Sequence, residues 1–263
     1  MRLGIGLTAL ALLVAACTEP PSDAAGTTSG VTVAATAALS SSSTTAVTAI
    51  ASTPTTLDPS PVATPEPIPI GVYRYATTGA ETIDVLGGER HEYPEITTIT
   101  VTDEGCGRVL RWDVVAQRYE IWGLCTDAES PALGAQAVQY HEFFGQKTPE
   151  PVDCDRTVPL GLAEPVTQVC ALADRDWNPT WTPEGERNLI INGVDVATQM
   201  WSMVVDDTDE FPERIDATWW FRSDGLPVRI EWDKWSISEN PLGGTVRYEE
   251  QFVIELVDDA PIR

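Results

Sequence analysis

Residues 217–232 read ATWWFRSDGLPVRIEW, and this stretch decides the fold class. The Asp224-Gly225 pair between two apolar-rich runs is a strong signal for a β-hairpin with a two-residue turn. Such a turn sets Trp219 opposite Ile230, and the strand period of two places alternate residues on opposite faces. One face of the predicted hairpin is then wholly apolar, and it carries Ala217, Trp219, Phe221, Val228, Ile230 and Trp232.

The other face of the predicted hairpin is polar apart from Trp220, which the same register sets directly across from Arg229. A guanidinium over an indole face is worth about 0.5–1 kcal/mol at an exposed site. We therefore predict that Trp220 is a solvent-side residue covered by Arg229.

The same alternation extends outward from the hairpin in both directions, and helical patterns are weak after the first residues. Residues 97–102, 109–114 and 119–125 predict a three-strand meander, and residues 194–205 predict another long strand. In residues 135–144 the alternation puts Val138, Tyr140 and Phe144 on one side. In residues 246–256 a single apolar row is interrupted by Glu250. The pattern predicts an all-β or nearly all-β domain of about ten antiparallel strands.

The cysteines indicate an oxidising compartment, because an even number remains once Cys17 is set aside. Four cysteines allow three pairings. A tight turn near residues 116–117 brings Cys106 within one register step of Cys125. The remaining pair, Cys154 and Cys170, then closes a short loop rich in proline and polar residues. We predict the disulfides Cys106–Cys125 and Cys154–Cys170.

Residues 1–16 are typical of a cleavable leader, with Arg2 followed by an apolar run too short to span a bilayer core of about 30 Å. The run ends Val14-Ala15-Ala16-Cys17, which resembles the bacterial lipobox. This resemblance implies a diacylglyceryl group on Cys17 and an anchor on the outer face of the cell membrane, where a lipoprotein with two or more acyl chains is held stably.

Residues 17–70 form the lipidated cysteine and a predicted disordered linker, since residues 18–70 have no aromatic residue, Lys or Arg. All nine Trp, six Tyr and five Phe fall in residues 71–263, which we predict to be one domain. The formal net charge of −24 repels phosphates, so nucleic acid is excluded as a partner.

Signatures of catalysis and of metal binding are absent from the sequence. No GxSxG, HExxH or Gly-rich phosphate loop occurs, and the cysteine spacing gives no zinc pattern. His91 and His141 are expected to be surface or cross-strand residues. The acidic run at residues 206–210 suggests either a calcium site or, more simply, a solvated turn. We predict no catalytic residue, no metal and no cofactor.

Trp177 and Trp181 lie in a stretch broken by prolines, Asp-Trp-Asn-Pro-Thr-Trp-Thr-Pro. Two interpretations stay open for them. In the first interpretation, the two tryptophans stack on sugar rings or line an apolar cavity. In the second, they close the end of a barrel-like core.

Residues 218–229, TWWFRSDGLPVR, followed by a long alternating strand, resemble bacterial LolA-like carriers and the related mycobacterial LppX- and LprG-type lipoproteins. That resemblance implies an antiparallel sheet curved into a half-barrel or barrel-like domain whose concave apolar face accepts acyl chains. It implies a ligand-lining role for Trp219, Phe221, Ile230 and Trp232. The whole domain also resembles uncharacterised actinobacterial envelope lipoproteins, which imply no particular function.

Three hypotheses for function follow from these patterns. The first is a non-enzymatic, membrane-anchored extracytoplasmic domain that binds an apolar or glycolipid ligand. The second is a structural or protein-interaction module of the envelope with a filled core. The third, an enzyme, requires carboxylates that converge in a cleft.

Overall fold

The computed structural model describes residues 66–85, 87–126, 130–172, 175–208, 212–240 and 244–262. The predicted leader, Cys17 and most of the predicted linker lie outside these residues. Ile68, near the end of the predicted linker, is fully buried, and the Tyr73 hydroxyl donates to the Pro69 carbonyl at 2.9 Å. The packed domain therefore begins slightly ahead of the predicted boundary at Gly71, where the first strand starts.

Every regular element in the described residues is a strand. In chain order these are β1 Gly71–Asp84, β2 Glu89–Glu92, β3 Ile96–Glu104, β4 Gly107–Val115, β5 Arg118–Cys125, β6 Ala132–Phe143, β7 Gln146–Cys154, β8 Val158–Pro159, β9 Val166–Thr167, β10 Cys170–Ala171, β11 Asp176–Trp177, β12 Thr180–Ile191, β13 Val194–Asp207, β14 Glu213–Phe221, β15 Pro227–Asn240 and β16 Gly244–Leu256. The predicted all-β class is confirmed.

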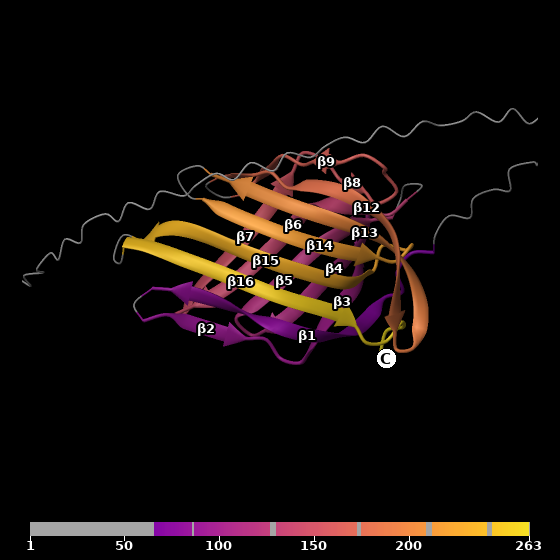
Figure 1. Cartoon of the computed structure of the whole chain (residues 1–263), viewed down its shortest axis with the longest axis horizontal. Coiled ribbons are helices and arrows are strands. Elements are labelled where there is room, and N and C mark those ends of the chain that lie inside the picture. Colours follow the sequence, from indigo (N-terminus) through magenta and orange to yellow (C-terminus); the bar gives the residue numbers. More distant parts are fainter. Residues whose placement is uncertain are drawn as a thin grey trace, which may run out of the picture. The chain divides into compact units, whose positions relative to one another are not determined.

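These strands form one antiparallel sheet in the order β11-β10-β7-β6-β5-β4-β3-β1-β16-β15-β14-β13-β12-β9, with β2 on β1 and β8 on β6. The sheet curls through 345° into a half-barrel, as predicted. In Figure 1, β12 to β16 lie across the front and β4 to β6 cross behind them, so that two walls of one sheet face each other. Side chains from both walls meet in the interior.

The hairpin that decides the fold class has the predicted register over most of its length. Ala217 pairs with Trp232, Trp219 with Ile230 and Trp220 with Arg229. The Arg229 guanidinium lies 5.6 Å from the centroid of the Trp220 rings, which confirms the predicted stacking.

The turn of this hairpin is longer than predicted. The register shifts at Phe221, which pairs with Pro227 instead of Val228. The Gly225 N–H donates to the Arg222 carbonyl, and the Leu226 side chain is fully buried. Gly225 has φ 92°, and a Cβ there would lie 2.7 Å from a Leu124 methyl group. The turn therefore packs against β5, and this contact accounts for the extra residues.

Both predicted disulfides are present at their predicted positions. Cys106 and Cys125 lie at the open end of the β4–β5 hairpin with their Cα atoms 4.7 Å apart. Cys154 of β7 pairs directly with Cys170 of β10, with a Cα separation of 3.8 Å.

The predicted alternation in β6 places Val138 and Tyr140 on one side, as expected, and the strand ends before Phe144. Gln139, His141 and Phe143 point into the half-barrel and are buried, whereas Tyr140 lies on the outside. The Tyr140 ring stacks there on Tyr119 of β5 at a centroid distance of 4.5 Å. The side of β6 that carries Gln139 and His141 faces the interior because one half of that interior is polar.

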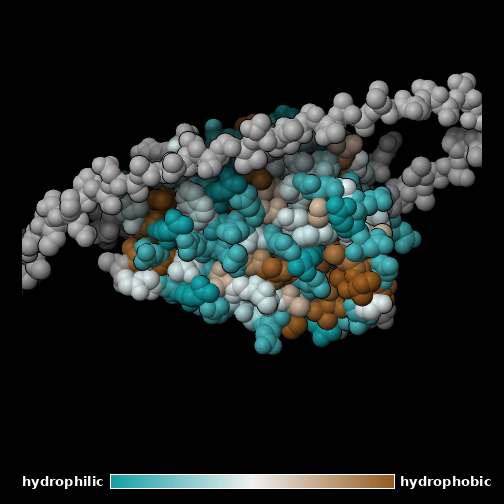
Figure 2. Space-filling view, in the orientation of Figure 1, coloured by the Kyte–Doolittle hydropathy of each residue, from teal (hydrophilic) through white to brown (hydrophobic). Residues whose placement is uncertain are grey.

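The visible face of the molecule is mostly hydrophilic, with small hydrophobic areas between the polar ones (Figure 2).

Candidate functional site

Aromatic residues fill one half of the interior, and we call this group the tryptophan cluster: Trp112, Trp122, Trp181, Trp219, Phe221, Trp232 and Phe252. Trp219 lies at its centre. Its rings meet Trp122 edge-on at 5.2 Å and stack on Phe221 at 5.6 Å. Trp232 stacks on Phe252 at 5.7 Å. Offset and edge-to-face packing of this kind stabilises aromatic pairs beyond the area they bury.

A cavity of about 60 Å³ lies against the tryptophan cluster. Its wall includes Trp122, Trp177, Trp181, Trp219 and Trp232. Two of the four residues predicted to line a ligand site, Trp219 and Trp232, therefore reach the cavity. The other two, Phe221 and Ile230, are buried but do not line it.

The indole N–H groups of Trp201, Trp219 and Trp232 are buried and have no hydrogen-bond partner among the residues that the structure describes. Leaving a buried donor unsatisfied costs about 1–3 kcal/mol, so such groups are rare and call for an explanation. Trp181 provides the contrast, because its N–H donates to the Gln168 amide oxygen at 3.0 Å. Two of these three tryptophans, Trp219 and Trp232, also line the cavity.

The wall of the cavity is polar where Glu120 and Gln139 approach it. The Gln139 amide oxygen accepts from the Lys234 ammonium at 3.2 Å, and Glu120 bonds Arg118. The cavity is therefore apolar on one side and polar on the other.

Charged residues fill the second half of the interior, and we call this group the charged cluster: Glu81, Arg118, Glu120, His141, Glu213, Lys234 and Glu250. Arg118 is its centre. Its guanidinium donates to Glu250 at 3.0 Å and lies 3.6 Å from Glu81. Lys234 and Glu213 form a second pair at 2.9 Å. Buried charges require such pairing, because an unpaired charge costs several kcal/mol.

The environment shifts the pKa values of the buried carboxyls in opposite directions. Burial, assisted by the neighbouring Glu250, raises the pKa of Glu81, and burial also raises the pKa of Glu120. For Glu213 burial acts in the same direction but is outweighed by Lys234 and Arg175, so its pKa is lowered. Glu213 is therefore held ionised more firmly than the other two.

The two histidines contact Glu81 from different sides. His91 Nδ1 lies 2.7 Å from one carboxylate oxygen, and His141 Nδ1 lies 3.2 Å from the other. Burial lowers the pKa of His141, and Arg118 lowers it further. For His91 burial is outweighed by Glu81 and Glu89, so its pKa is raised. Of the two expected positions, surface or cross-strand, His141 has the second: it is buried and pairs across strands with Arg118.

The sequence patterns pointed to few of these residues. Glu250 interrupts an apolar row and was visible as an anomaly, but Glu81, Arg118 and Glu213 carried no comparable signal. Trp177 and Trp181 both line the cavity, and Trp181 also belongs to the packed core. The two tryptophans therefore line a cavity, as the first interpretation predicts, and Trp181 also packs in the core, as the second predicts.

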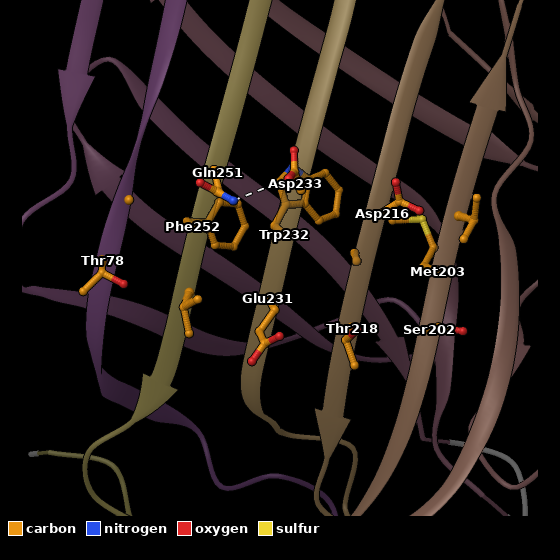
Figure 3. Close-up of a pocket in the computed structure, with 14 residues that line it drawn as sticks. Thr78, Ser202, Met203, Asp216, Thr218, Glu231, Trp232, Asp233, Gln251 and Phe252 are labelled. Atoms are coloured by element: carbon orange, nitrogen blue, oxygen red, sulfur yellow. Dashed lines mark hydrogen bonds between the residues drawn. The ribbon is translucent and has the colours of Figure 1, made fainter. Parts of the chain in front are cut away.

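A larger hollow of about 570 Å³ crosses the outer face of β1, β16, β15, β14 and β13 (Figure 3). Polar and apolar atoms both contribute to its lining, and Gln251 donates to Asp233 there at 3.4 Å. Two further carboxylates are already bound by arginines, Asp216 by Arg214 at 2.6 Å and Glu231 by Arg229 at 2.7 Å. The hollow is thus a solvated trough with satisfied charges, and the interior cavity is the better candidate site.

Within the described residues, no cluster of three or more His, Cys, Asp or Glu side chains could hold a metal ion. Asp209 and Glu210 of the acidic run lie outside those residues. None of the described elements is a helix long and apolar enough to cross a membrane.

No protein-family profile matches the chain, and neither does any curated protein or solved structure.

Proposed function

We propose that this protein is a non-enzymatic, lipid-anchored binding protein outside the cytoplasm. Its half-barrel takes an apolar ligand, or the apolar part of a glycolipid, against the tryptophan cluster. The anchor is the acylated Cys17, and the linker separates the domain from the membrane surface.

The observation that carries this proposal is that Trp219 and Trp232 line the cavity and have buried indole donors without a partner in the described residues. Trp219 and Trp232 lose hydrogen bonds to water when they are buried, and the described part of the chain supplies no acceptor in return. An ester carbonyl, an ether or a hydroxyl oxygen on an otherwise apolar ligand supplies one. Binding sites for such ligands are mostly apolar, with a few polar groups that fix orientation.

The enzyme hypothesis is less well supported by the charged cluster. Carboxylates do converge there, but Glu250, Glu120 and Glu213 are each bonded to Arg118 or Lys234. Of the four buried carboxylates in the described residues, only Glu120 lies on the wall of the interior cavity. A general acid or base needs to reach its substrate within hydrogen-bonding distance.

The test is a titration of the mature protein with a fluorescent fatty-acyl ester probe. We expect saturable binding that Trp232→Ala weakens strongly, because Trp232 lines the cavity. The matched control is Trp220→Ala, which removes an indole from the outer face of the neighbouring strand and should bind the probe as wild type does. Absence of saturable binding to wild type, or equal loss in both variants, would contradict the proposal.

The cavity volume favours a second candidate function. About 60 Å³ is well below the roughly 300–1,000 Å³ of drug-sized ligand pockets. A packed interior of this kind suits a structural or protein-interaction module of the envelope. In that case Trp232→Ala costs about 3–5 kcal/mol of stability, as for a packed aromatic residue, and the wild type binds no probe.

A further inference from the structure

One short segment closes the gap between the two ends of the curled sheet, and we call residues 166–171 the strap. Its first two residues form β9 and pair with Thr180 and Trp181 of β12. Its last two form β10 and pair with Asp153 and Cys154 of β7. Only Gln168 and Val169 lie between them. The strap therefore joins strands that stand near opposite ends of the strand order.

The strap also forms part of the wall of the interior cavity. Gln168 lines the cavity, as do Cys154 and Trp181, the residues that flank the strap on its two sides. The Gln168 side chain is buried and bonded at both ends. Its amide oxygen accepts from the Trp181 indole at 3.0 Å, and its amide nitrogen donates to the Arg156 carbonyl at 2.8 Å.

The two sides of the strap are attached very differently. On the β7 side the Cys154–Cys170 disulfide is covalent. Two hydrogen bonds between Asp155 and Val169 support it, each 2.9 Å long.

On the β12 side the attachments are hydrogen bonds and the packing of the partly buried Val166 against the core, and none is covalent. Two residue pairs join β9 to β12, whereas β12 and β13 are joined along eleven. The Thr167 and Thr180 hydroxyls lie 3.0 Å apart at an exposed position, and the Gln168 N–H donates to the Pro179 carbonyl at 3.0 Å. Segments with few and exposed hydrogen bonds open locally at lower free energy than the rest of a fold.

We propose that the strap is the gate through which ligand reaches the tryptophan cluster. The gate opens on its β12 side when Gln168 leaves Trp181, while the disulfide keeps the strap attached to β7. This inference rests on the proposed function, and it explains how a cavity of about 60 Å³ serves a larger ligand. The closed structure is the ligand-free state, and entry of ligand displaces the strap.

The experiment is a covalent lock across the β12 side. Thr167 and Thr180 are directly paired, and Cα atoms of directly opposed residues lie about 4.5–5.5 Å apart, within disulfide range. The oxidised double variant T167C/T180C therefore cannot open there. The matched controls are the two single-cysteine variants and T167S/T180S, which keeps both hydroxyls. Peptide mapping verifies that Cys154–Cys170 is retained in each protein.

Two measurements distinguish a failure of the gate proposal from a failure of the proposed function. The first needs no ligand: hydrogen exchange of the Trp181 indole N–H should slow about ten-fold or more in the locked protein, because exchange requires the strap to leave. The second is the association rate of the fluorescent fatty-acyl ester probe, which should fall by a similar factor.

Each combination of results has one meaning. Equal indole exchange in locked and control proteins overturns the gate, whatever the probe does. Slowed exchange with an unchanged probe association rate overturns the strap as the entry route and leaves the proposed function standing. If exchange slows in the locked protein but the wild type binds no probe, the strap opens as proposed and the proposed function is overturned. Slowing of both supports the gate.

Discussion

Arg118 bonds both carboxylate oxygens of Glu250 inside the half-barrel, with Nε 3.0 Å from Oε1 and Nη2 3.2 Å from Oε2. Arg118 begins β5 and Glu250 lies in β16, and β4, β3 and β1 separate these strands in the sheet. The pair therefore spans the interior. It joins the two walls of the curled sheet at a point where both ions are shielded from water.

Arg118→Met should destabilise the domain by about 3–5 kcal/mol, because it leaves Glu250, Glu120 and Glu81 without their shared cation. Urea unfolding of both proteins measures the change. Arg90→Gln is the control, since Arg90 pairs with Glu92 on the exposed surface and should alter stability by no more than about 0.5 kcal/mol. Similar small losses in the two variants would show that the interior pair is not a significant stabilising contact.

The free energy of unfolding should depend on pH because His141 titrates differently in the folded and unfolded states. Its pKa is lowered in the folded protein, so below the ordinary value of 6.5 the unfolded chain takes up a proton that the folded one does not. The stabilising contribution of neutral His141 is present above pH 6.5 and is lost as the pH falls from there towards the folded pKa. The loss is at most about 1.4 kcal/mol per pH unit.

His141→Gln removes this titration and leaves His91 in place. The free energy of unfolding of wild type should therefore fall faster than that of His141→Gln between pH 7 and pH 5. Parallel curves over this range would mean that His141 titrates normally in the folded state.

Local features of this fold were predictable from the sequence because neighbours along the chain determine them. The Trp219–Ile230 pairing depends on one turn, and Cys106 reaches Cys125 through a single hairpin. The turn at Gly225 was mispredicted because its geometry depends on Leu124 of a distant strand.

The charged cluster was not predictable in the same way. Arg118 and Glu250 are separated by 132 positions, and only the curl of the sheet brings them together. The sequence did not show which side of β6 is buried for the same reason, since Gln139 and His141 face inward to meet Lys234 and Glu81. A period of two gives the two faces of a strand, but it identifies the inner face only when the interior is apolar.

Replacing tryptophan with phenylalanine removes the indole N–H, so the loss of stability should differ between bonded and unbonded donors. Trp181→Phe leaves the Gln168 amide oxygen without its donor, so we expect a loss of about 1–3 kcal/mol beyond the change in packing. Trp219→Phe removes a donor that has no acceptor, so its loss should be smaller despite equal burial of the ring. Denaturant unfolding compares the two, and a larger loss in Trp219→Phe would contradict the unpartnered state of its N–H.

Removal of the Cys154–Cys170 disulfide should loosen the strap as well as destabilise the domain. The two cysteines are 16 positions apart in the sequence, for which chain entropy gives about 3 kcal/mol. C154S/C170S should show that loss together with faster Trp181 indole exchange. C106S/C125S, with a similar separation, should show a comparable loss without the faster exchange. Identical exchange in the two variants would mean that the disulfide does not restrain the strap.

Cys17→Ser should abolish lipidation and processing of the leader at that site, because the lipobox-like run requires the thiol. Partitioning into detergent, measured for wild type and variant expressed in a bacterial host, checks this. A variant that still enters the detergent phase as wild type does would contradict the lipid anchor.

The central claim is that the half-barrel holds an apolar ligand with oxygen acceptors against Trp219 and Trp232. Native mass spectrometry of the protein released from its own membrane measures this most directly. The account predicts a bound species in the wild-type spectrum whose mass corresponds to a lipid or another oxygen-bearing apolar molecule, reduced in Trp232→Ala and retained in Trp220→Ala. A wild-type spectrum that shows only the polypeptide and its acyl anchor would contradict the claim.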